Sequence, residues 1–401
     1  MLLHAQPDDS SRFTTRLLEN RYDLSIRNGQ FAGAGAPLLR SAIAQSRFVL
    51  VGEEHGFAET PLFWTGVCNA AGPEGFHTMA IEEGPLVAAS LERWAGLPDG
   101  LAELAAFEKQ YPESVQIYNT REEFEMLQRC AQSAHGGRFR LWGLNQEALG
   151  AAGLILSRIL DTSPGAESRA AIEELLRKND EAYAKALETG RMSNLFILSA
   201  DDKDLAAGAA VLEKDGSPQA QSLFRSLIES HEINKAWPAS AERRSRMMKM
   251  LFAARYAEAA RSEASPPKIL LKFGAYHLFR GLNPLHASGI GNYVAEFADG
   301  LGAQSLHIYV MAVKGSHSFY PKYGQPAQLR PFDLKDDPRS RYLQPMLANL
   351  LESGWTMYDL RPLRPLLNGP PGSINADLAN LISGMDILVM ASQARPATLI
   401  R

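Results

Sequence analysis

The sequence predicts an α/β fold with a mostly parallel central sheet flanked by helices and a large all-helical insertion. Two observations support this prediction. Short apolar segments alternate with amphipathic helical patterns, and one long stretch contains helical patterns alone. The chain has 401 residues, of which 45% are hydrophobic, so it can bury a large core in one big domain or two.

Seven segments have the composition of buried strands. They are almost continuously apolar and rich in β-branched or aromatic residues, as is typical of strands covered on both faces of a parallel sheet. They are residues 47–52, 77–82, 138–143, 268–273, 305–310, 355–359 and 386–390. Between the first strands, residues 58–71, 86–95 and 121–134 have the apolar spacing of helices, which implies right-handed crossover connections.

The chain divides into four parts on this interpretation. They are an N-terminal segment (1–40), the first part of the α/β domain (41–147), the helical insertion (148–265) and the second part of the α/β domain (266–401). The insertion is rich in Ala, Leu, Glu, Lys and Arg and has no convincing strand pattern. It would form either a lid or wall over a site, or a packed subdomain without a gating role.

Composition excludes some partners and leaves the compartment open. The net charge of −4 and the lack of a Lys/Arg run argue against nucleic acid as a partner. No apolar stretch approaches the ~18 residues that span a bilayer, so we expect a soluble protein. The first nine residues are too short for a signal peptide but resemble the remainder of one, so the cytoplasm is slightly favoured and the periplasm is the alternative. Cys68 and Cys130 are predicted to be unpaired helical thiols, with a disulfide as the alternative.

Four successive predicted strands end in ionisable or amide side chains. Because ligands bind at the carboxyl ends of parallel strands, we expect these side chains to meet at one edge of the sheet. Clustered carboxylates and imidazoles shift one another's pKa values, as acid–base catalysis requires. The predicted catalytic residues are Glu53, His55, Glu82 and His277, and the predicted substrate-binding residues include Glu54, Glu83, Asn145, Arg280 and, past the fifth strand, His317.

Several other kinds of site lack their motifs. No Gly-x-Ser-x-Gly elbow is present for a serine nucleophile, and no glycine-rich phosphate loop follows a strand. For Glu54 and Glu83, the alternative to a functional role is an ordinary first-turn position at a helix N-terminus. The remaining interpretations are a His/Glu site that activates water and a site that holds a metal ion.

Short motifs resemble the erythromycin esterase-like group, and more broadly the superfamily that also contains the ChaN-type haem-binding lipoproteins and the Tiki/TraB proteases. The resemblance is carried by Phe48-Val-Leu-Val-Gly-Glu-Glu-His-Gly, by Ala80-Ile-Glu and by a strand ending near His277. Further similarities are Arg244-Ser-Arg-Met-Met-Lys-Met before Lys268-Ile-Leu-Leu, and the final Asp386-Ile-Leu-Val-Met.

The resemblance implies roles for particular residues. Glu53 and His55 match the Glu and His of the first motif, whose His is the proposed base, and Arg244 matches the helix arginine and joins the predicted substrate-binding residues. Two departures from the esterase pattern are present. Only Glu54 separates Glu53 from His55, where the esterases have two residues, and Gly274 stands where they carry a histidine.

The leading hypothesis is therefore a hydrolase acting on a small-molecule ester or lactone, without an expected cofactor. In it, Glu53 and Glu82 tune His55, and His277, with Arg280, stabilises negative charge on the substrate. A haem- or metal-binding protein without turnover, with His55 and His277 as ligands, is the second hypothesis. A metal-dependent peptidase is the third, and a divalent ion would be held by Glu53, His55, Glu82 and His277.

Overall fold

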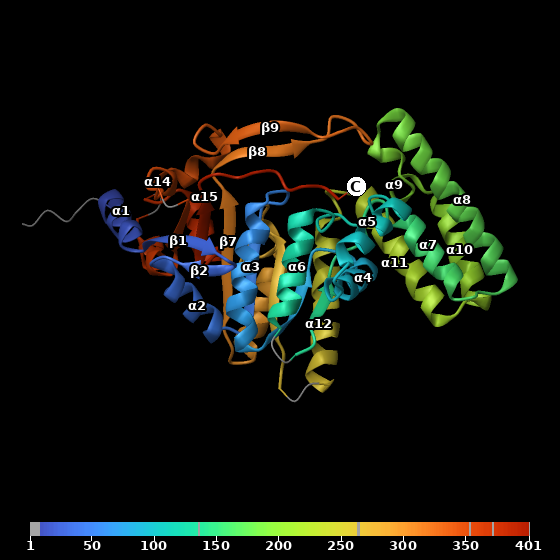
Figure 1. Cartoon of the computed structure of the whole chain (residues 1–401), viewed down its shortest axis with the longest axis horizontal. Coiled ribbons are helices and arrows are strands. Elements are labelled where there is room, and N and C mark those ends of the chain that lie inside the picture. Colours follow the sequence, from blue (N-terminus) through green and yellow to red (C-terminus); the bar gives the residue numbers. More distant parts are fainter. Residues whose placement is uncertain (1–8, 135–136, 263–264, 353, 371–372, 401) are drawn as a thin grey trace, which may run out of the picture.

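The computed structural model describes residues 9–134, 137–262, 265–352, 354–370 and 373–400. Its centre is a nine-stranded sheet with the strand order β2-β1-β10-β11-β7-β3-β6-β4-β5 (Figure 1). The strands are β1 (Arg21–Arg27), β2 (Gln30–Ala32), β3 (Phe48–Glu53), β4 (Phe76–Ile81), β5 (Arg140–Gly143), β6 (Lys268–Gly274), β7 (Ser305–Ala312), β10 (Trp355–Asp359) and β11 (Ile387–Ala391).

Six neighbouring strands, from β11 to β5 in the sheet order, run parallel, whereas β10, β1 and β2 add an antiparallel margin. The predicted α/β fold class is thereby confirmed, and all seven predicted strands are present. The antiparallel direction of β10 was not predicted, because an apolar run does not set strand direction. The N-terminal segment supplies β1 and β2 to the sheet.

A separate hairpin of β8 (Lys314–Phe319) and β9 (Gln328–Asp333) crosses the carboxyl end of the sheet (Figure 1). Its residues are half-buried or exposed, so it lacks the apolar signal that identified the other strands. Near its tip, the Tyr323 backbone N–H donates to Gly190 O at 3.0 Å, and the rings of Tyr183 and Tyr323 are 6.4 Å apart. The hairpin therefore touches the helical insertion.

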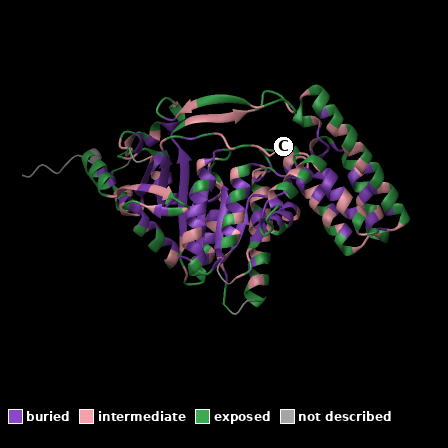
Figure 2. Ribbon diagram, viewed as in Figure 1, coloured by how far each residue is buried: buried purple, intermediate pink, exposed green. Residues whose placement is uncertain are grey.

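Helices cover both faces of the sheet, and buried residues concentrate along the strands and the inner sides of these helices (Figure 2). Alternate strand residues point to opposite faces. One face packs against α2 (Gly35–Gln45), α3 (Glu59–Ala71), α4 (Pro85–Ala95), α5 (Gly100–Gln110) and α6 (Arg121–Ser133). The other packs against α1 (Asp9–Glu19), α12 (Ala241–Ser262), α13 (Ile290–Gly300), α14 (Gln344–Leu347) and α15 (Ala376–Gly384).

The described part of residues 148–265 contains six α-helices and no strand. Five of them, α7 (Ala152–Asp161), α8 (Ala166–Thr189), α9 (Phe196–Ser199), α10 (Asp202–Asp215) and α11 (Pro218–Lys235), belong to a helical body with its own hydrophobic core. The sixth, α12, returns to the sheet and packs Met248, Phe252 and Tyr256 against β3 and β6. The insertion is thus tied directly to the strands that carry the predicted site.

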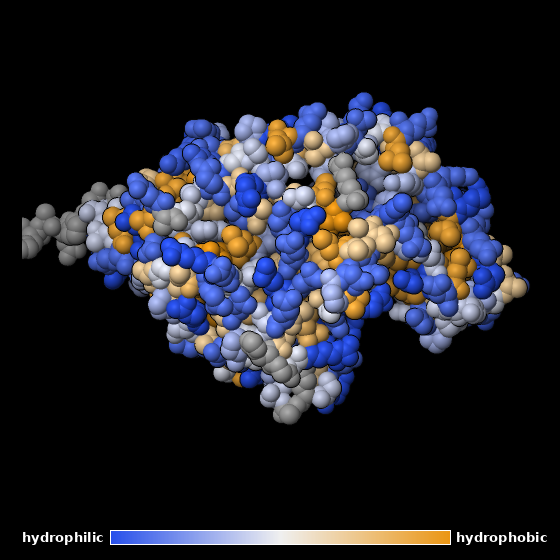
Figure 3. Space-filling model, viewed as in Figure 1, coloured by the Kyte–Doolittle hydropathy of each residue, from blue (hydrophilic) through white to orange (hydrophobic). Residues whose placement is uncertain are grey.

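The last residues run back across the carboxyl end of the sheet. Ala397 N donates to Gly56 O at 2.8 Å, and Arg121 N donates to Thr398 O at 2.8 Å. In the ranges that the structure describes, no helix is both long enough and apolar enough to cross a bilayer. On the face shown in Figure 3, hydrophobic side chains form small patches separated by hydrophilic ones.

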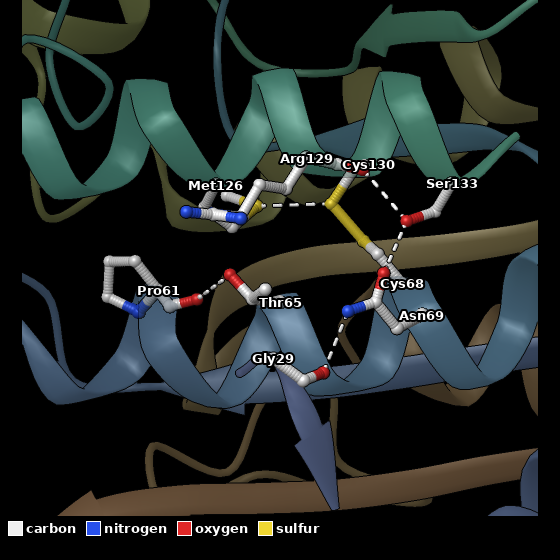
Figure 4. Close-up of a disulfide and its surroundings, with 9 residues drawn as sticks. All are labelled: Gly29, Pro61, Thr65, Cys68, Asn69, Met126, Arg129, Cys130 and Ser133. Atoms are coloured by element: carbon white, nitrogen blue, oxygen red, sulfur yellow. Dashed lines mark hydrogen bonds between the residues drawn. A yellow bond between two sulfur atoms is a disulfide. The ribbon is translucent and has the colours of Figure 1, made fainter. Parts of the chain in front are cut away.

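Cys68 on α3 and Cys130 on α6 form a disulfide, so the prediction of two unpaired thiols was wrong (Figure 4). The two helices pack side by side on the same face of the sheet, and the Cα atoms of the cysteines are 5.0 Å apart. Their sequence separation of 62 residues gave no hint of this proximity.

We expect the Cys68→Ala/Cys130→Ala double variant to lose about 2–4 kcal/mol of unfolding free energy, because the disulfide closes a long loop in the unfolded chain. Urea denaturation followed by circular dichroism measures the change. Dithiothreitol should lower the stability of the wild type similarly and leave the double variant unaffected. Equal sensitivity of both proteins to the reductant would contradict the disulfide.

Candidate active site

The four predicted catalytic residues meet at the carboxyl edge of the sheet. Glu53 is the last residue of β3, and His55 lies in the turn that follows it. Glu82 directly follows β4, and His277 ends the 3-10 turn Ala275–His277 after β6. Since β3, β6 and β4 are adjacent and parallel, their carboxyl ends bring the four side chains together.

Glu82 is the hub of the cluster. Its Oε1 accepts from Arg244 Nη2 at 2.7 Å and lies 3.3 Å from His277 Nε2. Its Oε2 accepts from the Gly274 backbone N–H at 2.7 Å and lies 3.4 Å from His55 Nε2. Burial alone would raise the pKa of Glu82, but His277 and His55 outweigh it and hold this pKa well below its ordinary value. Glu82 is therefore a permanent anion at neutral pH.

His55 is held between two carboxylates. Its Nδ1 is 3.0 Å from Glu53 Oε1, within hydrogen-bond distance, while its side chain is 38% exposed. Burial alone would lower the pKa of His55, but its hydrogen bonds and the charges of Glu53 and Glu82 raise it to about 10. The imidazole is consequently protonated at neutral pH, and it loses its proton only toward alkaline pH.

Beneath His55 lies a buried ionic network that the sequence did not reveal. Lys272, in the middle of β6, donates to Glu53 Oε1 and, at 3.0 Å, to Glu123 Oε1 on α6. All three side chains are almost inaccessible to solvent. Burial alone would raise the pKa of Glu53, but the Lys272 charge and His55 outweigh it and lower this pKa. Burial dominates for Glu123 and raises its pKa to about 7.

Arg244 reaches the cluster from α12. Its Nε donates to Asn145 Oδ1 and Gln146 Oε1, both at 2.9 Å, which follow β5. Its Nη1 lies 3.3 Å from His277 Nε2, and its guanidinium carbon lies 5.8 Å from the centre of the Trp237 ring. The structure therefore brings Arg244, Asn145 and His277 together, and it adds Gln146 and Trp237, which the sequence did not single out.

Two further predicted residues belong to the edge of the cluster or lie beneath it. Glu54 is half-buried and weakly bound to the Ala312 backbone N–H at 3.5 Å, and burial raises its pKa to about 7. Glu83 is fully buried and accepts from the backbone N–H groups of Gln116 and Ile117 at 2.7 and 3.0 Å. Because no ligand can reach Glu83 in this arrangement, we withdraw its assignment to substrate binding.

Arg280 and His317 are engaged elsewhere. Both terminal nitrogens of Arg280 donate to Asp386 at 2.7 Å, which ties the loop after β6 to β11 instead of facing His277. His317 lies on β8 and packs its ring against Phe332, 6.0 Å between centres. We therefore withdraw the assignment of Arg280, whereas the role of His317 in substrate binding stays a prediction. Arg244 occupies the position beside His277 that the sequence had given to Arg280.

The sequence did contain a signal for one of the missed residues. Lys272 is a charged residue inside the apolar run Lys268-Ile-Leu-Leu-Lys-Phe, and a lysine there must find buried anions. Glu123 gave none, because an acidic residue in the first turn of a helix is commonplace. Trp237 lies in the turn before α12, where its exposure could not be predicted.

The predicted metal set does not fit the observed contacts. Arg244 donates to Glu82 Oε1 and Lys272 donates to Glu53 Oε1, so each carboxylate already has a cation against it. Within the described ranges, no three His, Cys, Asp or Glu side chains are arranged to hold a metal ion.

Solved structures share this fold. A protein from Bacillus cereus matches with a TM-score of 0.58 at 15% identity, covering 98% of this chain and 100% of that one. A mutant of the erythromycin esterase EreC in its open conformation matches with 0.59 at 15% identity, covering 91% and 95%. A succinoglycan biosynthesis protein matches with 0.59 at 14% identity, covering 98% of each chain.

The chain therefore has the erythromycin esterase-like fold that its motifs implied, and at such low identity the likeness concerns the fold alone. Haem-bound ChaN of Campylobacter jejuni matches with a TM-score of 0.28, which carries no weight for the haem-binding hypothesis. No protein-family model matches the sequence. No curated protein matches it significantly.

We expect Lys272→Met to lower the unfolding free energy by about 3–5 kcal/mol at pH 8, because it leaves Glu53 and Glu123 buried without their cation. The pKa values of both carboxyls in the folded variant would then rise above those in the unfolded chain. The loss should accordingly shrink as the pH falls toward 5 and protons neutralise them. Denaturant titrations at both pH values measure it. Lys268→Met, at the start of the same strand, should cost less than about 1 kcal/mol; a similar cost for both would contradict the buried network.

The pKa of His55 should lie far above the ordinary ~6.5 of histidine, and Glu82→Gln should lower it because one of two flanking anions is removed. NMR titration of the imidazole C–H resonances measures both values, with the His55 signal assigned by its loss in His55→Asn. An ordinary pKa in the wild type, or the same pKa in Glu82→Gln, would count against the two-carboxylate arrangement.

Proposed function

We propose that this protein is a hydrolase that acts on a small ester or lactone with water activated by His55. One observation carries the proposal: a buried carboxylate, Glu53, holds Nδ1 of a histidine whose side chain is open to solvent. A carboxylate on Nδ1 fixes the tautomer that leaves Nε2 as the base and stabilises the imidazolium that forms. The fold shared with an erythromycin esterase supports this choice of reaction class.

In the proposed reaction, the neutral form of His55 takes a proton from water through Nε2. The water oxygen attacks the carbonyl carbon, and the carbonyl oxygen becomes an oxyanion. His55 then returns the proton to the departing alkoxide oxygen, which leaves a carboxylic acid and an alcohol, or a hydroxy acid from a lactone. Glu53 stays ionised throughout because Lys272 neutralises it from below.

Arg244 and His277 are the proposed oxyanion ligands. A guanidinium carries five N–H donors. The contacts of Arg244 with Asn145, Gln146 and Glu82 engage Nε and one hydrogen on Nη2. Nη1 donates to His277 Nε2 only when that nitrogen carries no proton, so at least two N–H groups remain for a substrate oxygen. Because Glu82 fixes the guanidinium in place, these donors are oriented before the substrate arrives, which is what transition-state stabilisation requires.

His55→Asn should lower hydrolysis of 4-nitrophenyl acetate about 10²–10⁴-fold, because it removes the base but keeps a side chain that can hydrogen-bond Glu53. Release of nitrophenolate measures the rate, and circular dichroism checks the fold. His77→Asn is the matched control, since His77 lies at the amino end of β4, on the opposite edge of the sheet. Undiminished turnover in His55→Asn would refute the role of His55 as base.

The value of kcat/KM should rise with pH roughly tenfold per unit and level off near the pKa of His55, about 10, because only the neutral imidazole accepts a proton. Glu82→Gln lowers this pKa, so its profile should level off at a lower pH. Rates between pH 6 and 10.5, corrected for spontaneous hydrolysis, give the profile. A profile that levels off near pH 6.5, or that is unmoved in Glu82→Gln, would contradict this assignment.

A further inference from the structure

Trp237 is exposed beside the site, unlike every other tryptophan of the chain. Its residue surface is 53% accessible, whereas Trp64, Trp94, Trp142 and Trp355 are at most 8% accessible. A tryptophan half in water leaves a large apolar face without a covering group. Single exposed apolar residues are ordinary on a protein surface, so the residues around Trp237 decide whether its exposure indicates a binding role.

The neighbour of Trp237 is the proposed oxyanion ligand. The Arg244 guanidinium carbon lies 5.8 Å from the indole centre, within the range of a cation–π contact. The same guanidinium contacts Glu82 and His277 through its terminal nitrogens, and the Arg244 side chain as a whole is 13% exposed. The accessible indole therefore lies beside Arg244, which is the side chain that would bind the reacting carbonyl.

The turn that carries Trp237 is fixed at both ends. Trp237 N donates to Asn234 O at 3.4 Å, and Ala241 N donates to Pro238 O at 3.1 Å as α12 begins. The Asn234 side chain in turn accepts from Gln146 Nε2 at 3.5 Å, which ties this turn to the residues after β5. Such anchoring fixes the backbone that carries the indole, and the contact with Arg244 holds the ring itself, so less ordering is required when a ligand stacks on it.

We propose that Trp237 is a stacking platform and that the substrate is an acyl compound with a ring next to its carbonyl group. The ring lies on the exposed indole face while the carbonyl oxygen reaches Arg244 and His277. Through this turn the helical insertion contributes to substrate recognition, whether or not it acts as a lid. The inference deepens the proposed hydrolase function, but its test measures binding without turnover.

Binding of benzoate and acetate to the full-length protein tests the platform, because both carry a carboxylate for Arg244 but only benzoate carries a ring. Isothermal titration calorimetry should give a Kd for benzoate at least about tenfold lower than that for acetate. In Trp237→Ala this advantage should fall below about threefold, and Trp237→Phe should retain part of it; the ratio of the two Kd values corrects for any effect of the substitution on Arg244. Arg244→Met should weaken both ligands.

The platform is overturned if benzoate binds no more tightly than acetate, if neither binds, or if the advantage survives in Trp237→Ala. Quenching of tryptophan fluorescence by benzoate gives a second reading, because Trp237 is far more accessible to solvent than the other tryptophans. His55→Asn separates the two proposals. Benzoate binding to this variant requires the platform but not the base. If the ring preference persists there and the wild type hydrolyses no ester, the hydrolase is refuted and the platform stands.

Discussion

The rest of the site depends on the contacts that the Glu82 carboxylate makes. Its two oxygens join four groups from three separate parts of the chain: the Gly274 backbone and His277 at the end of β6, Arg244 from α12, and His55 from the turn after β3. A buried carboxylate is costly unless charged or N–H partners surround it. These partners stabilise Glu82, and Glu82 in turn positions them.

Burial of the two carboxylates also determines how charge is distributed across the sheet. Glu53 points to the face covered by α6, where Lys272 and Glu123 lie, while Glu82 meets Arg244 from α12 on the opposite face. His55 bridges the two carboxylates across the end of the sheet. Each face supplies a cation for its own carboxylate, so the His55 imidazole lies between two paired carboxylates and is itself open to solvent.

The sequence predicted this convergence because the rule behind it needs only parallel strands and the residues that follow them. It could not predict orientation. Arg280 follows β6 as His277 does, yet its side chain turns to Asp386. Nor could it predict which helices pack together, so the Cys68–Cys130 disulfide and the contact of Arg244 with Glu82 emerge only from tertiary packing. The fold class was accessible because buried strands carry an apolar signal, which the polar β8–β9 hairpin lacks.

The two departures from the esterase motif, one residue instead of two between Glu53 and His55 and a glycine at position 274, form a single structural feature. Glu53 and Gly274 are paired across β3 and β6, so a histidine two residues after Glu53 lies over the end of β6. A Cβ atom on residue 274 would lie 3.0 Å from His55 Nε2 and 3.3 Å from Glu82 Oε2, closer than nearly all Cβ contacts. A larger side chain at 274 and a histidine at 55 would therefore compete for the same space. The short spacing is thus accommodated by the glycine, because any side chain at 274 would force His55 or Glu82 to shift by a few tenths of an ångström.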